Sequence, residues 1–253
     1  MIRTTMITLL VGAMSATALF GADEVRVGGG GASMATVFRP VKAHFEKDTG
    51  GIMVIAQSTP KNGLIDLLNG TVDIATAAVP FDSMVKGAEK EGVKVDTALL
   101  ESRVVAKNRT VLLVHPSNPV QALTKEQVKG IFTGKIVSWK EVGGSDTPIL
   151  VAWGKLTPGQ NAQFSKIILD GEPVLKDIID TTDYFGIKDT VAATPEAIGI
   201  DPFALGVDGT VKTIATEPPL SSDVIVVTKG KPTAKVQKLL SYVSGAGTKY
   251  IIK

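Results

Sequence analysis

The stretch VRVGGGGASMATVFRPVKAHF, residues 25–45, places a β-branched run, a glycine turn and an amphipathic helix in direct succession. After the four glycines at 28–31, apolar residues recur at the spacing of one helical face: Met34, Val37, Phe38, Val41 and Phe45. We expect Ser33 to cap this helix and Pro40 to kink it. A strand that runs through a tight turn into a helix is the repeating unit of α/β proteins, so this stretch predicts that fold class.

The rest of the chain repeats this alternation of β-branched runs and helix-period segments. We expect further strands at 52–56, 72–75, 110–114, 149–153, 197–200, 211–214 and 224–227. Helices are expected around 64–68 and 84–90, from a capping box at Thr124, after Pro158, and at 234–243 and 247–252. The pattern predicts mostly parallel sheets flanked by crossover helices.

A chain of 253 residues can form one large α/β domain or two lobes. If there are two lobes, the chain crosses between them twice, near 103–110 and 216–223. The first lobe is then discontinuous, with residues 23–103 plus 223–253, and the second comprises 104–222. Two crossings predict a two-strand hinge beside a cleft, and such clefts at the carboxyl ends of parallel strands hold the ligands of open α/β sheets.

The N-terminal residues 1–22 have the outline of a secretory signal peptide: Arg3, an apolar run over 6–20, and small residues before the first acidic side chains. Cleavage is expected after Ala18 or near Ala22. The apolar run is too short for a spanning helix, which needs about 20 residues. Because the chain has no cysteine, it has no residue for a lipid anchor. We expect a soluble exported protein; the alternative is an ordinary buried N-terminal helix.

The composition excludes several functional classes. The zero cysteine count excludes thiol nucleophiles, disulfides, iron–sulfur clusters, thiolate zinc sites and c-type haem. The net charge is +2, with no basic stripe, which argues against nucleic-acid binding. Neither His44 nor His115 has a recognisable nucleophile partner, and we expect surface and loop roles for them. The sequence therefore predicts no enzyme, no metal and no cofactor.

The glycine turn at 28–31 and the segment 130–135 resemble nucleotide-binding loops only in part. Ser33 stands where a dinucleotide fingerprint has its third glycine, and 130–135 has neither the spacing nor the hydroxyl residue of a phosphate-binding loop. The turn at 28–31 is either a tight turn without a ligand or a helix N-terminus that faces an anion or another ligand.

Three stretches together resemble one family. They are 28–33 with NGTVDIA at 69–75; 115–144, with HPSNPV, LTKEQV and IFTGKIVSWKEVGG in order; and AIGI at 197–200 with VDGTVK at 207–212. The middle stretch is similar, nearly residue for residue, to the NPSNPV…LTKEQL…IFSGKITNWKEVGG pattern of the phosphate-type periplasmic solute-binding proteins of ABC importers. The resemblance spans essentially the whole mature chain.

This resemblance implies a two-lobed periplasmic-binding-protein fold of class II type, in which each lobe is a mostly parallel sheet flanked by helices and two strands form the hinge. It implies a periplasmic monomer that closes on a small-molecule or oxyanion ligand, phosphate in this family, and delivers it to an ABC permease in the inner membrane. The family grips phosphate with hydroxyl groups, helix-terminal N–H groups, an arginine and an aspartate that accepts from the protonated anion.

The residues at the phosphate-contacting positions differ from that pattern in three loops. Ser33 keeps its hydroxyl, but Pro60 stands where the second loop has one, and Ala78 follows Ala77 where a serine is followed by an aspartate or arginine. In the loop before Phe164, Gly154 and Asn161 occupy the arginine positions, while Pro158 and Gln160 occupy the hydroxyl positions. Lys155 supplies a charge without bidentate geometry.

The resemblance and these substitutions predict a cleft lined by Ala32, Ser33, Met34, Ser58, Thr59, Lys61, Ala78, Lys155, Gly159, Gln160 and Asn161. Ser33 would act as a capping hydroxyl and donor, and Lys61 and Lys155 as counter-charges. The missing arginines predict a ligand less charged than phosphate, or no small ligand. The alternatives are a divergent member that serves as a periplasmic sensor or protein-interaction module, and an exported hydrolase, for which no nucleophile and base are found.

Overall fold

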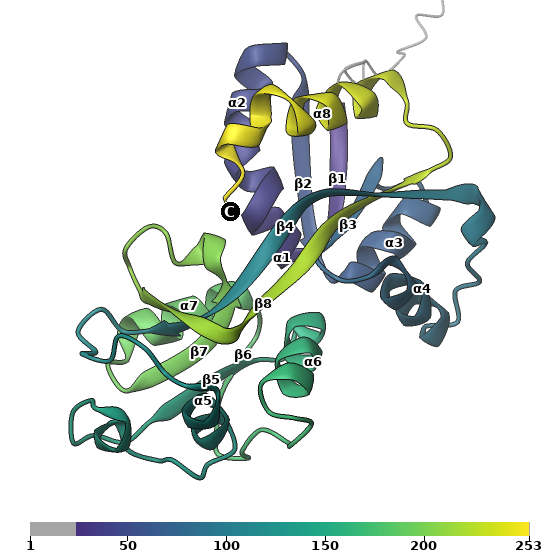
Figure 1. The fold of residues 1–253 in the computed structure, drawn as a ribbon. Helices are drawn as coiled ribbons and strands as arrows, with labels where there is room; N and C mark the ends of the chain where they lie inside the picture. The colour runs from purple at the N-terminus through teal and green to yellow at the C-terminus, as the bar shows by residue number, and fades with distance from the viewer. Residues whose placement is uncertain (1–23, 253) are drawn as a thin grey trace, which may run out of the picture.

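The computed structural model describes residues 24–252, and the predicted signal peptide at 1–22 lies outside them. Figure 1 shows two lobes joined by two long strands, β4 (Leu100–Val114) and β8 (Lys212–Lys229). The predicted two-lobed α/β fold with a two-strand hinge is confirmed. Because β4 and β8 belong to both lobes, the exact boundaries 23–103 plus 223–253 and 104–222 stay a prediction. Within residues 24–252, no helix combines the length and apolar character that crossing a membrane requires.

The remaining elements alternate along the chain. The strands are β1 (Glu24–Gly30), β2 (Ile52–Ser58), β3 (Ile74–Ala77), β5 (Leu150–Gly154), β6 (Ile179–Thr181) and β7 (Ala197–Pro202). The α-helices are α1 (Gly31–Ser33), α2 (Arg39–Thr49), α3 (Pro60–Leu68), α4 (Phe81–Lys90), α5 (Lys125–Phe132), α6 (Pro158–Ile167), α7 (Tyr184–Ala193) and α8 (Ala234–Ser244). A π-helical segment, η1 (Met34–Phe38), joins α1 to α2, and 3₁₀ turns occupy Thr97–Leu99, Trp139–Val142, Phe203–Leu205 and Ala246–Tyr250.

The strands form one curled sheet in the order β2-β1-β3-β8-β4-β7-β5-β6. The outer strands of each lobe are parallel to one another, β2, β1 and β3 in the first and β7, β5 and β6 in the second, whereas β8 and β4 are antiparallel at the centre. The predicted strands 211–214 and 224–227 are two ends of β8, and β4 begins ten residues before the predicted strand 110–114. Polar residues in the middle of both hinge strands interrupt the apolar pattern, so the sequence pattern predicted only the apolar ends as strands.

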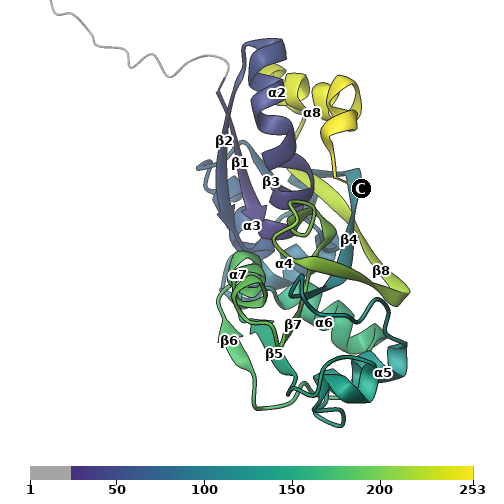
Figure 2. The same ribbon diagram turned by 90° about the vertical axis from the view of Figure 1, so that its left-hand side faces the viewer.

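Each lobe has its own apolar core. In the first lobe, Val25 and Val27 of β1 pack with Phe38 and Phe45, as their helical spacing predicts. In the second lobe, Phe132, Trp153 and Phe164 meet edge to face, with ring centroids 4.8–6.1 Å apart. Both cores include residues of the hinge strands, Val224 and Val226 in the first lobe and Leu112 and Ile214 in the second. Figure 2 shows the two lobes at opposite ends of these strands.

The glycines at 28–30, predicted as a turn, instead extend β1, and the helix begins directly at Gly31. Its N-cap is Gly30 rather than Ser33; the Ser33 hydroxyl lies inside the first turn and donates to the Gly30 carbonyl at 2.8 Å. Pro40 has no N–H for the carbonyl of Thr36, and that carbonyl instead accepts from the Ile252 N–H at 3.1 Å. The π-helical segment ends at Phe38, so Pro40 stands in the first turn of α2, and the predicted kink stays a prediction.

The structure adds two elements that the sequence pattern did not predict, β6 and α7, and it replaces the predicted helix at 247–252 by a 3₁₀ turn. His44 stacks on Tyr250 with ring centroids 3.5 Å apart. His115 closes its turn by accepting from the Ser117 N–H at 3.2 Å. Neither histidine faces the region between the lobes that is described below.

The capping box of α5 provides a stability test. The Thr124 hydroxyl accepts from the Gln127 N–H at 3.2 Å, and the Gln127 side chain accepts from the Thr124 N–H at 2.9 Å. Thr124→Ala should lower the free energy of unfolding by about 1 kcal/mol, whereas Thr124→Ser should retain it, because serine caps as well as threonine. Urea denaturation measures both; equal losses in the two variants would show that the hydroxyl contributes nothing.

Candidate functional site

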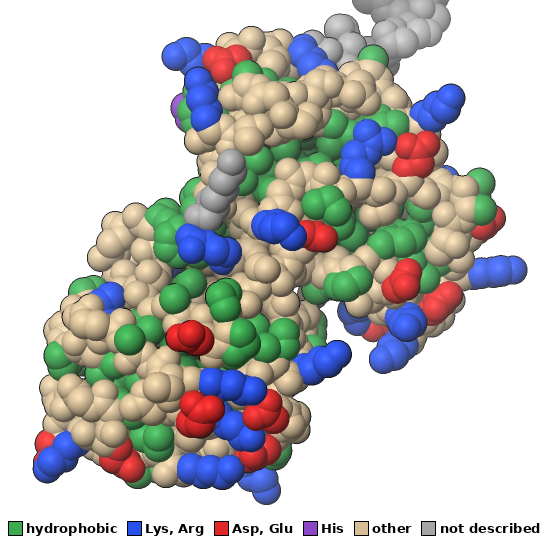
Figure 3. Space-filling model, viewed as in Figure 1, with side chains coloured by type: hydrophobic (Ala, Val, Ile, Leu, Met, Phe, Trp, Pro, Cys, Tyr) green, Lys and Arg blue, Asp and Glu red, His purple; other side chains and the backbone are tan. Residues whose placement is uncertain are grey.

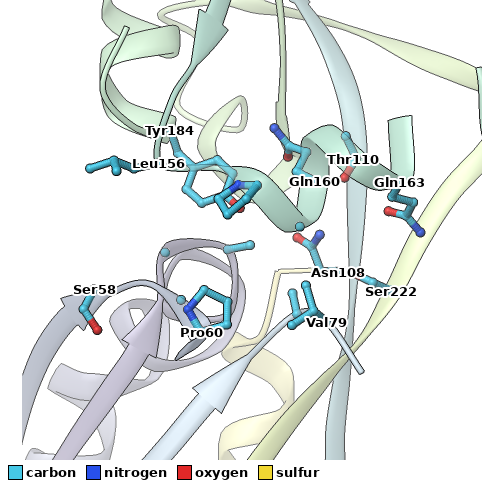
Figure 4. Close-up of a pocket in the computed structure, with 16 residues that line it drawn as sticks. Ser58, Pro60, Val79, Asn108, Thr110, Leu156, Gln160, Gln163, Tyr184 and Ser222 are labelled. Carbon is cyan, nitrogen blue, oxygen red and sulfur yellow. The ribbon is translucent and has the colours of Figure 1, made fainter. Parts of the chain in front are cut away.

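Four helices begin where the two lobes face each other. The N-termini of α1 and α3 come from the first lobe, and those of α6 and α7 from the second, and residues of all four first turns line one cavity (Figure 4). The first N–H groups of a helix have no partner within it, and the helix dipole is positive at that end. The cavity is therefore built to favour negative charge.

No charged side chain among the described residues lines this inner cavity. Its polar lining consists of amides, hydroxyls and the backbone of Gly30, Gly31 and Ala32. Its volume is about 20 Å³, which is room for about one water molecule. A ligand larger than water must therefore enter while the lobes are further apart, as expected for a hinge-closing cleft.

Two glycines let the lobes touch across the cleft. A Cβ added to Gly31 would lie 2.7 Å from Cδ2 of Tyr184, and one added to Gly159 would lie 2.3 Å from Cγ1 of Val79. Both distances are too short for real carbon atoms, so these positions need glycine in this closed arrangement. Beside them, the Arg39 guanidinium of the first lobe lies over the Phe185 ring of the second, 5.4 Å from its centroid.

The hinge strands contribute polar side chains to the cavity. Asn108 and Thr110 of β4 are each 3 % exposed, and Ser222 of β8 lies beside them in the lining (Figure 4). The Asn108 carbonyl oxygen accepts from the Thr36 hydroxyl at 3.0 Å, which leaves the Asn108 amino group as a donor. Sequence reasoning missed these residues, although they fall inside the predicted crossings 103–110 and 216–223.

Gln160 is the most constrained polar side chain in the lining. It is 7 % exposed, and its Nε2 donates to the Ile200 carbonyl of β7 at 2.8 Å. Its Oε1 atom has no partner, and buried polar atoms in native proteins nearly always have one. Gln160 therefore combines a fixed orientation with a free acceptor at the cavity.

The structure brings five of the predicted site residues together. Those in the inner lining are Ala32, Ser58, Ala78, Gly159 and Gln160. Thr59 and Lys61 line a wider groove that continues outward from the cavity. The Thr59 hydroxyl caps α3 by accepting from the Asn62 N–H at 3.3 Å, so it has a structural role as well.

The other four predicted residues lie outside the cavity lining. Ser33 is buried behind it in the first helical turn, and Met34 belongs to the core of the first lobe. The Asn161 amide donates to the Gly154 carbonyl at 2.8 Å and stabilises the loop before α6. Lys155 is exposed and pairs with Asp180 at 2.9 Å.

Neither lysine predicted as a counter-charge stands in the inner cavity. Lys61 pairs with Glu91 across α3 and α4, and this hydrogen bond lowers the pKa of the Glu91 carboxyl. Because Lys61 and Lys155 are both paired with carboxylates and neither lines the inner cavity, the groups of its described lining that favour an anion are the helix N-termini and polar side chains.

Tyr184 was missed because α7 was not predicted. Two signals could have revealed this helix: Asp183 is a good N-cap residue, and Ile187 and Val191 share one helical face. In the structure, the Asp183 carboxylate accepts from the Gly186 N–H at 3.1 Å. Burial raises the pKa of the Tyr184 phenol, with Asp201 and Asp183 adding to the effect, so the phenol stays neutral.

Asp201 lies in β7, near Tyr184, and its carboxyl group is fully buried. Neither of its oxygens has a hydrogen-bond partner. Burial raises its pKa well above the usual range for a carboxyl, Asp183 raises it further, and Lys188 opposes the shift. Asp201 is therefore a neutral acid in the folded protein at moderately acidic pH.

The wider groove has a volume of about 740 Å³ and lies between α3 and α4 of the first lobe and α6 of the second. The space-filling view shows the surface notched between the lobes on the side of α4 and α6 (Figure 3). The groove and the inner cavity share seven lining residues: Pro60, Ala78, Val79, Pro158, Gly159, Gln163 and Ser222. They are therefore two parts of one continuous cleft.

Comparisons with known proteins agree with this geometry. Residues 16–246 match a family model described as the PBP superfamily domain. The phosphate-binding protein PstS of Bacillus subtilis is 30 % identical over 232 residues, covering 87 % of this chain and 74 % of the relative.

Two crystal structures share the fold. A phosphate ABC transporter substrate-binding protein from Clostridium perfringens, solved with bound phosphate, has a TM-score of 0.74 at 23 % identity. An ABC-type phosphate transport receptor from Vibrio cholerae has a TM-score of 0.61 at 20 % identity. Each comparison covers 90 % of this chain and 96 % of the other. The chain therefore belongs to the PBP superfamily and, within it, to the family of the PstS phosphate-binding proteins.

Proposed function

We propose that this protein is the substrate-binding component of a phosphate-type ABC importer and captures an oxyanion between its lobes. The observation that carries the proposal is the convergence of four helix N-termini, two from each lobe, on one cavity beside a two-strand hinge. The B. subtilis relative, which is named as a phosphate-binding protein, supports phosphate as the family ligand.

Capture follows from this geometry. An anion in the open cleft meets the free N–H groups of one lobe, and closure adds those of the other lobe together with the Asn108 amino group and the Ser222 hydroxyl. The Gln160 Oε1 atom can accept from a protonated oxygen of the anion. Hydrogen bonds to a charged ligand are each worth about 1.5–3 kcal/mol, so several of them favour the closed state. The ligand thus determines which conformation a permease would meet.

The remaining parts of the proposal follow from the same role. The protein would be a binding protein without catalytic activity, exported by a cleaved signal peptide and free of a lipid anchor. Its partners would be a small oxyanion and an inner-membrane permease. The names of the relatives support the binding and transport roles.

One observation favours a second candidate function. Pro60 and Pro158 stand at the first positions of α3 and α6 and have no N–H to offer an anion, and no cation lines the inner cavity among the described residues. A member that no longer holds inorganic phosphate would fit this lining and would serve as a periplasmic sensor or protein-interaction module.

Thermal unfolding of the protein purified from the periplasm of an exporting host tests the proposed function. Phosphate or methylphosphonate at 100 times its dissociation constant should stabilise the protein by about 2.7 kcal/mol. Gln160→Leu should reduce this stabilisation, because it removes the acceptor for a protonated oxygen of the ligand and the anchor of α6 on Ile200. The matched variant Gln237→Leu, on the exposed face of α8, should not. If millimolar phosphorus oxyanions leave the midpoint of the parent protein unchanged, the second candidate replaces the first.

A further inference from the structure

The outer groove is much larger than an inorganic anion requires. Its volume of about 740 Å³ falls within the range of about 300–1,000 Å³ typical of small-molecule sites. The inner cavity, by contrast, has room for little more than one water molecule in the closed structure. The cleft therefore has a narrow polar end and a wide outer end.

The walls of the groove are apolar on both sides. Val79 and Pro80 stand on the first lobe, and Pro158, Ala162 and Ile167 on the second. Lys61 and Lys166 are the charged residues among its described lining. An apolar wall of this kind favours hydrocarbon over water, whereas the helix N-termini of the inner end favour an oxyanion.

Ala78 lies at the junction between the two ends, since it lines both of them. No carboxylate among the described residues lines the inner cavity, and the acceptor without a partner there is the neutral Gln160 Oε1, which can accept one hydrogen from the ligand. A ligand with a P–C or P–O–C bond in place of one P–OH has no hydrogen to donate at that position. Its substituent can instead pass Ala78 into the groove.

We propose that the preferred ligand is an organic phosphorus oxyanion, a phosphonate or phosphate monoester, with its charged head in the inner cavity and a short apolar substituent in the outer groove. This inference rests on the proposed function, because it assumes that the helix N-termini hold the head. It accounts together for the apolar groove, its continuity with the cavity and the absence of an acceptor carboxylate.

Isothermal titration calorimetry with a graded ligand series tests the inference. The probes are inorganic phosphate, then methyl-, ethyl- and butylphosphonate. Butyrate is added as a carboxylate with a hydrocarbon chain of similar length. Each methylene that enters the groove should increase affinity about fourfold, so butylphosphonate should bind up to about 60-fold more tightly than methylphosphonate. Butyrate should bind more weakly than butylphosphonate, because its planar head offers fewer oxygens to the converging N–H groups.

Variants at Ala162 separate the groove from the cavity. Ala162 is exposed on α6 and lines only the outer groove. Ala162→Trp should weaken the binding of butylphosphonate at least tenfold relative to the parent protein. Its affinity for inorganic phosphate should stay within about twofold of the parent value. Ala162→Leu should give a smaller loss if the tryptophan variant folds poorly. The matched control is Ala234→Trp, at an exposed alanine in the first turn of α8.

The possible outcomes distinguish this inference from the proposed function. If inorganic phosphate binds and affinity falls steadily with chain length, the inference is overturned while the proposed function stands. If butyrate binds as tightly as butylphosphonate, the assignment of a phosphorus head is wrong. If no phosphorus oxyanion binds, the proposed function itself fails.

Discussion

Replacing Gly159 with alanine should weaken ligand binding by about tenfold or more. In the closed structure, the added Cβ would lie 2.3 Å from Cγ1 of Val79 on the opposite lobe. Relieving such a contact by moving packed groups costs about 1–3 kcal/mol. Because Val79 and Gly159 meet only across the cleft, this cost falls on the closed state, and ligand binding depends on closure. Calorimetry with phosphate and butylphosphonate measures the loss.

A second substitution should restore binding. In Gly159→Ala combined with Val79→Ala, the nearest atom of residue 79 to the new Cβ is its own Cβ, at 3.7 Å, an ordinary van der Waals contact. The double variant should therefore bind more tightly than the single one. Ser165→Ala, on the same helix and outside both linings, is the matched control. A double variant as weak as Gly159→Ala would show that the glycine acts through α6 rather than through the closed cleft.

The fold was predictable because its signals are local. The run of valines, glycines and spaced apolar residues at 25–45 formed the expected strand and helix, with Phe38 and Phe45 in the core, although the glycines at 28–30 extend the strand instead of forming a turn. The hinge was harder to predict, since the polar middle of β8 interrupts the apolar pattern that marks a strand. Such a long strand gains its stability from pairing with β4 on both sides of its polar middle, which a local pattern does not reveal.

The site residues that could be predicted are those in loops that could be aligned with the sequence pattern of the phosphate-type solute-binding proteins. Gly159, Gln160 and Ala78 were found in this way, and they line the cavity. Tyr184 was not, because its helix was missed, and Lys155 was placed by a charge argument although its partner Asp180 holds it on the surface. Side-chain partnerships across the two lobes depend on tertiary geometry, and sequence spacing contains no information about them.

Asp201→Asn should increase the stability of the protein at neutral pH, and the increase should grow with pH. The carboxyl is fully buried in β7 without a partner for either oxygen. Burial and the nearby Asp183 raise its pKa well above the ordinary value of 3.8. Lys188 opposes the shift, but its ammonium is paired with Asp208, whose pKa it lowers to about 2. Because Lys188 pairs with Asp208, it offsets only part of the rise in the pKa of Asp201.

The direction of the pH dependence follows from proton linkage. The folded protein holds a proton on Asp201 that the unfolded chain releases above the ordinary carboxyl pKa, so the folded state binds more protons. The contribution of Asp201 to stability is fully present below that ordinary pKa and is lost as pH rises toward the folded-state pKa. The loss amounts to at most about 1.4 kcal/mol per pH unit. Asparagine does not titrate, so Asp201→Asn removes this loss.

Urea denaturation of the parent protein and Asp201→Asn at several pH values from 4.5 to 8.5 measures the difference directly. The two proteins differ only at this residue, so the contributions of the rest of the chain cancel in the comparison. The difference in the free energy of unfolding should therefore rise with pH in favour of the variant. Asp208→Asn should instead lower the stability by a nearly constant amount across this range, because the pKa of Asp208 is lowered from 3.8 to about 2 and its contribution is lost only at lower pH. A constant difference between the parent and Asp201→Asn across this range would mean that Asp201 titrates normally and that its carboxyl reaches water.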